Sequence, residues 1–241
     1  MKSKPKLLLL PNVLDESCDH RLFFPKTVDE AVFTLDGLFA ESLPGGRHFL
    51  RRFSFSRARK VVDIPILLLN EHTQKNELEE LLKPVLEGQT WGIVSDAGLP
   101  CFADPGSQLV YLAHQKNIEV EAFVGPSSIV LGLMLSGLSA QNFSFQGYLP
   151  KKPEELQKKL KELQTISTKE KMVQIFIETP YRNNKMLETL VHTLQDNTIL
   201  CVASDITLPA QNVRTMSIKS WKKGPLPDLD KKPAIFLFQS F

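Results

Sequence analysis

Cysteine is scarce in this sequence, and its three copies, Cys18, Cys101 and Cys201, lie far apart. The number is odd and no Cys-x-x-Cys pair occurs, which argues against a disulfide framework and against a cysteine-based zinc site. The five histidines also lack metal-ligand spacing, so no metal site is predicted. Together these absences favour a reducing compartment, and we expect a cytoplasmic protein.

Long apolar runs are missing as well. No stretch approaches the roughly 20 apolar residues that a transmembrane helix needs, so no membrane association is expected. The apolar run at residues 7–10 follows a basic start but stops at Pro11, which makes it too short for a signal peptide and favours a buried strand. The net charge of +2 is too small to indicate nucleic acid by itself. The composition is typical of a soluble globular protein.

Short apolar runs alternate with helical patterns along most of the chain, and this alternation predicts a mainly parallel sheet with helices on both faces. The helix near residue 28 is predicted to begin with Thr27 as N-cap and Glu30 as its capping-box partner. Strands are predicted at residues 6–10, 38–40, 64–69, 91–94, 118–124, 143–146, 172–177, 199–203, 213–218 and 234–238.

The last third of the chain has a different rhythm, because no strong helical pattern separates its final predicted strands. We therefore expect antiparallel strands in the second half. The predicted fold class is α/β with two α/β domains. Residues 1–124 would form an N-terminal domain with a parallel sheet, and residues 125–241 a C-terminal domain with a mixed sheet.

The loop after the predicted strand 91–94 carries the most information about function. It reads Ser95-Asp96-Ala97-Gly98-Leu99-Pro100 and leads through Asp104-Pro105-Gly106 into a helical pattern. A second strand-to-helix loop, Gly125-Pro126-Ser127-Ser128, is of the same kind. In open α/β folds, ligands bind at the carboxyl ends of strands, so both loops would offer N–H groups and polar side chains to a ligand. The alternative is ordinary turn and capping chemistry.

Two more polar positions follow predicted strands. Glu178 comes directly after residues 172–177, with Arg182 four positions later, and this pair suits either a ligand contact or a structural ion pair. His72 lies just past residues 64–69 and is either a base or an ordinary polar loop residue. Neither position by itself decides between function and structure.

A basic, aromatic segment runs from Arg47 to Lys60 (residues 47–60). Arginine and phenylalanine together can neutralise phosphates and stack on unpaired bases, so the segment is a candidate contact for single-stranded RNA. The alternative is a helix that packs Phe49, Leu50 and Phe53 inward and leaves its arginines in solvent.

The order of these motifs resembles that of a known family. The stretches are Val94-Ser95-Asp96-Ala97-Gly98-Leu99-Pro100, Asp104-Pro105-Gly106, Gly125-Pro126-Ser127-Ser128, Ser136-Gly137-Leu138, Phe145-Gln146-Gly147-Tyr148-Leu149-Pro150 and Ile177-Glu178-Thr179-Pro180-Tyr181-Arg182. They resemble the tetrapyrrole methylase superfamily of S-adenosylmethionine (SAM) methyltransferases, and within it the branch that methylates ribose 2′-oxygens of small-subunit ribosomal RNA.

The resemblance implies two α/β domains with SAM in a cleft between them, within a homodimer. It implies that the cofactor-binding residues are Asp96, Ala97, Gly98, Leu99, Ser127, Ser128, Tyr148, Ile177, Glu178 and Ala234. A ribose hydroxyl must also lose its proton, and the candidate bases or orienting groups are Glu41, His72 and Glu178.

The resemblance leaves other activities open. Segments such as 11–15, 40–47 and 204–208 depart from the family's usual pattern. A non-catalytic SAM- or RNA-binding protein of the same fold therefore remains an alternative, as does a methyltransferase that acts on a tetrapyrrole-like small molecule. A nucleotide-binding α/β enzyme unrelated to methylation is a third possibility.

Overall fold

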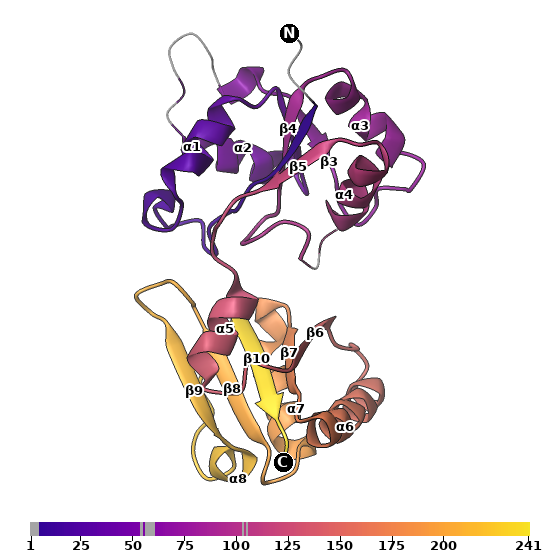
Figure 1. Cartoon of the computed structure of the whole chain (residues 1–241). Helices are drawn as coiled ribbons and strands as arrows, with labels where there is room; N and C mark the ends of the chain where they lie inside the picture. Colours follow the sequence, from indigo (N-terminus) through magenta and orange to yellow (C-terminus); the bar gives the residue numbers. More distant parts are fainter. Residues whose placement is uncertain (1–4, 54, 56–60, 103, 105) are drawn as a thin grey trace. The chain divides into compact units, whose positions relative to one another are not determined.

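The computed structural model describes residues 5–53, 55, 61–102, 104 and 106–241. The chain divides into two compact units, Met1–Ser127 and Ser128–Phe241, each built on its own five-stranded sheet (Figure 1). The predicted fold class, two α/β domains, is confirmed. The limits 1–124 and 125–241 for separate domains stay a prediction.

The sheet of the first unit is fully parallel, with strand order β3-β2-β4-β1-β5. A helix lies between each pair of consecutive strands, as connections between parallel strands require. The strands are β1 (Lys6–Leu9), β2 (Gly37–Ala40), β3 (Ile66–Leu68), β4 (Thr90–Val94) and β5 (Glu119–Ala122). The helices are α1 (Lys26–Phe33), α2 (Leu43–Arg51), α3 (Leu78–Leu86) and α4 (Gly106–Gln115).

Alternate residues of the central strands feed two apolar cores, one on each face of this sheet. Leu8 and Leu38 pack with α1 and α2, whereas their neighbours Leu7 and Phe39 pack with α3 and α4. The helix after β1 and the helix after β4 therefore cover opposite faces, although β1 and β4 are adjacent strands. Loops that diverge in this way from neighbouring strands form the crevice in which open α/β sheets bind ligands.

The second unit has a mixed sheet with the order β6-β7-β10-β8-β9. Only β6 and β7 pair in parallel, and the remaining neighbours are antiparallel, as expected for the second half. The strands are β6 (Phe143–Tyr148), β7 (Val173–Ile177), β8 (Ile199–Ser204), β9 (Asn212–Ser217) and β10 (Ala234–Gln239).

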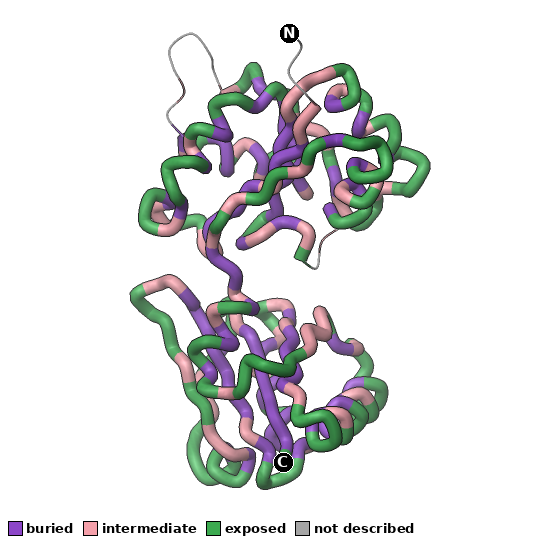
Figure 2. Tube along the Cα trace, in the orientation of Figure 1, coloured by how far each residue is buried: buried purple, intermediate pink, exposed green. Residues whose placement is uncertain are grey.

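Helices α6 (Pro153–Glu170), α7 (Asn183–Thr193) and α8 (Ile218–Trp221) build the main core of this unit with one face of the sheet. Helix α5 (Ser128–Ser136) lies on the other face, where its Gly132 faces Ile235. Figure 2 shows the central strands of both units as mostly buried. Short 3₁₀ helices cover His20–Leu22, Val61–Asp63 and Pro180–Arg182.

Each predicted strand corresponds to an observed one, but one helix start is wrong. Helix α1 has Pro25 as its N-cap, so Thr27 lies inside the first turn. A proline before a helix fixes the extended backbone that an N-cap needs, and this signal outweighed the Thr27–Glu30 capping pattern. Among the described residues, no helix is both long and apolar enough to cross a membrane.

Candidate functional site

The loops after β1, β4 and β5 meet at the carboxyl edge of the first sheet. Asn12, which follows β1 and is only 7% exposed, donates its side-chain amide to the carbonyl oxygens of Ser95 and Asp96, both at 3.0 Å. The backbone N–H of Asn12 also bonds to the carbonyl of Gly98 at 2.7 Å. The Asp96 loop is therefore fixed by the loop of the neighbouring strand.

Glu41, the first residue after β2, joins the same edge. Its Oε1 accepts a hydrogen bond from the backbone N–H of Asp96 at 3.0 Å. Burial raises the pKa of the Glu41 carboxyl, and the nearby carboxylates of Asp96 and Asp104 raise it further, against the hydrogen bond from Asp96. The structure thus brings Glu41 and the Asp96 loop together, which the sequence could not show.

Two glycines allow these loops to approach one another. Gly98 has φ of +75°, a left-handed conformation that favours glycine. A Cβ there would lie 3.2 Å from Leu14 and 3.4 Å from the carbonyl oxygen of Pro126. A Cβ on Gly125 would lie only 2.1 Å from the Cβ of Pro11. The segment that holds Ser127 is thereby packed directly against the other two loops.

Asp104 organises the end of the Asp96 loop. Its carboxylate accepts hydrogen bonds from the backbone N–H groups of Cys101 (2.7 Å) and Gly106 (2.8 Å), where α4 begins. The backbone N–H of Asp96 is bound by Glu41, and that of Gly98 donates to Val13. The prediction that this loop offers free N–H groups to a ligand is therefore wrong for these four amides.

The charge of this edge decides which ligands it suits. Glu41, Asp96 and Asp104 lie close enough that the latter two act on the charge state of Glu41. An acidic edge with the start of α4 already capped by a carboxylate repels a phosphate group, but it attracts a positively charged one. The site therefore fits a cationic ligand better than a nucleoside triphosphate.

Cys101 lies in this loop as a protonated thiol. Burial raises its pKa to about 12, and the charge of Asp104 adds to the shift. In a variant that keeps only Cys101 (Cys18→Ser with Cys201→Ser), we expect alkylation by iodoacetamide at pH 8 to be about 10³-fold slower than that of an ordinary free cysteine, because the thiolate is the reactive form. Alkylation at the rate of free glutathione, followed by mass spectrometry, would contradict this.

The predicted residues of the second unit also lie at one edge of their own sheet. Tyr148 pairs with Ile177 across β6 and β7, and Ile177 pairs with Ile235, which follows Ala234. Glu178, buried just beyond β7, forms an ion pair with Arg182, with its Oε2 at 3.1 Å from the guanidinium. The structure thus contains the ion pair between Glu178 and Arg182 that the structural interpretation predicts. Tyr148, by contrast, is exposed.

His72 is not drawn into either cluster. It follows β3, the edge strand, and its side chain is 85% exposed, with Nε2 at 3.7 Å from the Glu71 carboxylate beside it. The structure therefore gives no geometric support to a base at this position.

The described part of the basic segment follows the alternative interpretation for its apolar residues but not for all of its arginines, since Arg47 and Arg52 are half-buried. Phe49, Leu50 and Phe53 are buried in the core, so they are not available to stack on bases. Arg47 donates to the carbonyl oxygens of Val61 and Ile64, at 2.8 and 2.7 Å. The expected aromatic contact with RNA is therefore wrong for Phe49 and Phe53. Residues 54 and 56–60 of this segment lie outside the described part of the chain.

Sequence reasoning missed two residues near the Asp96 loop. Asn12 was visible only as a polar residue after the first apolar run, and its burial could have been inferred from that position. His48, on α2, lines a pocket together with Asn12 and Asp96. No spacing in the sequence connects these three residues, because only the parallel pairing of β1, β2 and β4 brings them together.

The fold and the candidate site define an α/β protein whose parallel sheet places polar and acidic residues at its carboxyl edge. Residues 39–221 match the family model of the Tetrapyrrole (Corrin/Porphyrin) Methylases. The match spans well over half of the sequence, and the chain belongs to this family. The resemblance seen in the sequence is thereby confirmed.

Curated relatives of this chain carry the name ribosomal RNA small subunit methyltransferase I. The Thermotoga maritima protein is 34% identical over 145 residues, which cover 59% of this chain and 62% of that protein. The Vibrio cholerae protein is 30% identical over 150 residues, or 62% and 51% of the two chains. The Synechocystis protein is 31% identical over 183 residues, or 76% and 61%. The chain thus spans less than two thirds of the length of these relatives.

Solved structures agree on the fold. The methyltransferase CobJ superposes with a TM-score of 0.63 at 13% identity, covering 99% of this chain and 94% of that one. The uroporphyrin-III-C-methyltransferase from Thermus thermophilus gives a TM-score of 0.55 at 14% identity, with 100% and 93% coverage. At such identities the likeness establishes the architecture alone.

Proposed function

We propose that this chain is a SAM-dependent methyltransferase that acts on ribosomal RNA. The acidic carboxyl edge of the first sheet carries the proposal, because Glu41 and Asp96 suit the positive charge of a sulfonium donor. The names of the curated relatives support ribosomal RNA as the acceptor. The ribose 2′-oxygen as the methylated atom follows from the resemblance of the motifs.

In this proposal the first unit holds the donor through the loop that Asn12 and Glu41 fix in place. The bound donor supplies an electrophilic methyl group, so the protein's main task is to orient the acceptor and exclude water. Glu41 acts as an orienting group, since its carboxylate is already engaged with Asp96. The proposed donor contacts are Asp96, Ala97, Gly98, Leu99, Ser127, Ser128, Tyr148, Ile177, Glu178 and Ala234.

The remaining parts of the proposal rest on resemblance and composition. His72 and Glu178 stay predictions as bases, and the segment from Arg47 to Lys60 stays a candidate RNA contact only through its exposed cations, such as Arg51. We further propose a homodimer in the cytoplasm. Sedimentation analysis tests the dimer independently of activity.

Two measurements test the proposed function. Calorimetry should show saturable binding of SAM and no comparable binding of ATP. Incubation with methyl-labelled SAM and unmodified small-subunit ribosomal RNA, transcribed in vitro and offered both free and assembled with ribosomal proteins, should give labelled 2′-O-methylnucleosides after digestion.

Other outcomes identify the alternatives. SAM binding without transfer to either RNA substrate would favour a non-catalytic binding protein. Transfer to a tetrapyrrole such as uroporphyrinogen, but not to RNA, would reassign the acceptor. ATP binding without SAM binding would overturn the proposal altogether.

A further inference from the structure

A pocket of about 250 Å³ opens beside the first turns of α2 in the first unit. Residues of the loop after β1, of α2 with its N-cap, and of the loop after β4 line it, among them Asn12, Glu16, Ser42, His48, Arg52 and Asp96. Asn12 and Asp96 also build the edge described above. The α2 pocket therefore adjoins the proposed donor site.

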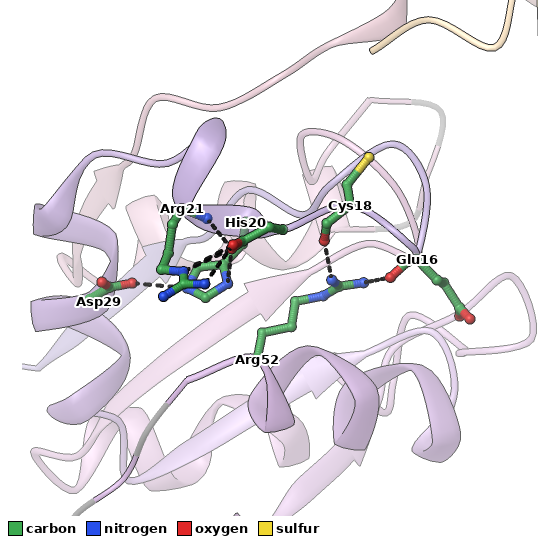
Figure 3. A network of polar contacts seen from close by, with 7 residues as sticks. Glu16, Cys18, His20, Arg21, Asp29 and Arg52 are labelled. Atoms are coloured by element: carbon green, nitrogen blue, oxygen red, sulfur yellow. Dashed lines mark hydrogen bonds and ion pairs between the residues drawn. The ribbon is translucent and has the colours of Figure 1, made fainter. Parts of the chain in front are cut away.

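Arg52 fixes one wall of the α2 pocket. Its guanidinium donates to the carbonyl oxygens of Cys18 at 3.0 Å and of Glu16 at 3.3 Å, which ties the loop after β1 to α2 (Figure 3). With this loop held in place, the Glu16 carboxylate lies 3.9 Å from Nδ1 of His48. Nη1 and Nη2 of Arg52 thus donate their hydrogen bonds to the protein's own backbone.

The walls of the α2 pocket have the chemistry of a sugar site. Glu16 and Asp96 provide carboxylates and Ser42 a hydroxyl, all of which accept hydrogen bonds from sugar hydroxyls. The same carboxylates repel a phosphate, and Nη1 and Nη2 of Arg52 already donate to the carbonyl oxygens of Cys18 and Glu16. A volume of about 250 Å³ is below the roughly 300–1,000 Å³ that encloses a whole small ligand. The pocket thus fits one sugar of a longer chain.

We propose that the α2 pocket receives the ribose of the acceptor nucleotide and that His48 accepts the proton of its attacking hydroxyl. This inference rests on the proposed function and adds the acceptor subsite and its base. His48 suits the role because its side chain is 49% exposed, where a substrate can reach it. Glu16, Asp96 and Arg52 are the charged groups that line the pocket with His48, and Glu16 is the positioning residue.

The step balances without any further reactant. The ribose oxygen forms a bond to the methyl carbon, the bond between that carbon and the sulfonium sulfur breaks, and the sulfur is left as a neutral thioether. The hydroxyl proton passes to the neutral imidazole of His48, which becomes an imidazolium and releases the proton to water.

The first test replaces His48 by glutamine, with His114→Gln on the exposed end of α4 as the matched control. We expect His48→Gln to lower the turnover number for RNA methylation by about 10²-fold or more while the dissociation constant of SAM is unchanged. The wild-type rate should fall on the acid side of its pH profile, where a protonated imidazole cannot accept a proton, and His48→Gln should lack this limb. Glu16→Gln should show a smaller loss of turnover.

A second readout does not depend on turnover. In protein labelled with ¹³C-histidine, a uridine pentaribonucleotide should shift the His48 signal, which is assigned from its absence in His48→Gln. The 2′-O-methylated pentamer should shift it less. Wild-type turnover and pH profile in His48→Gln, or a His48 signal unmoved by RNA, would overturn the inference but leave the proposed function intact. Failure of the wild type to bind SAM would instead overturn the proposed function.

Discussion

Replacing Asn12 by aspartate is expected to destabilise the first unit by about 3–5 kcal/mol at pH 8, although the two side chains have nearly the same shape. Asn12 donates two hydrogen bonds to the carbonyl oxygens of Ser95 and Asp96 and accepts one from Val13. A buried carboxylate cannot donate, so it would face two carbonyl oxygens as an unpaired charge. Urea unfolding of the two proteins measures the difference.

The pH dependence of Asn12→Asp has a definite sign. In the folded state, burial beside carbonyl oxygens raises the pKa of the new carboxyl above its unfolded value. At a pH below the pKa of the unfolded state, the carboxyl is protonated in both states and the loss of stability is smallest. The loss of stability grows as the pH rises through the pKa of the unfolded state, and it levels off above the pKa of the folded state.

Asn12→Ala is the control for this prediction. It removes the same hydrogen bonds without adding a charge, and should cost about 1–3 kcal/mol with no such pH dependence. Equal stabilities of Asn12→Asp and Asn12→Ala at pH 8 would show that water reaches this position and that the site is less enclosed than its burial indicates.

The sequence predicts the Asp96 loop as a ligand-binding loop but does not show which residues hold that loop in place. An apolar run that ends in Asp96, Gly98 and Pro100 indicates a strand followed by a ligand-binding turn. This prediction can be made without knowing the order of the strands in the sheet. Asn12 and Glu41 fix this loop from positions more than 50 residues away. Their role depends on the parallel pairing of β4 with both β1 and β2, which a single sequence does not reveal.

In the basic segment, by contrast, the sequence itself held the information that decides between the two interpretations. Its arginines and phenylalanines were the reason to expect RNA, yet Phe49 and Phe53 are four residues apart, which places them on one face of a helix. That spacing favoured core packing, and the structure confirms it. Arg47 and Arg52 then bind backbone carbonyl groups of neighbouring segments. The composition of this segment indicated an RNA partner, whereas the spacing of its phenylalanines indicated that they pack in the core.

Gly125→Ala is expected to disturb the proposed donor site more than any other single methyl group added to its loops. The new Cβ would lie 2.1 Å from the Cβ and 2.8 Å from the Cγ of Pro11. A proline ring cannot turn away as a flexible side chain would, so the loops after β1 and β5 must separate. Overpacking of this kind costs about 1–3 kcal/mol of stability.

Separation of these loops also moves Pro126, whose carbonyl oxygen lies against Gly98, and with it Ser127. We therefore expect Gly125→Ala to weaken SAM binding about tenfold or more in calorimetry, alongside a lower melting temperature. Gly224→Ala is the matched control, because no atom lies within 4 Å of the Cβ it would add. If Gly125→Ala melts earlier but binds SAM like the wild type, the donor does not depend on the contact between these loops, and Ser127 is not one of its ligands.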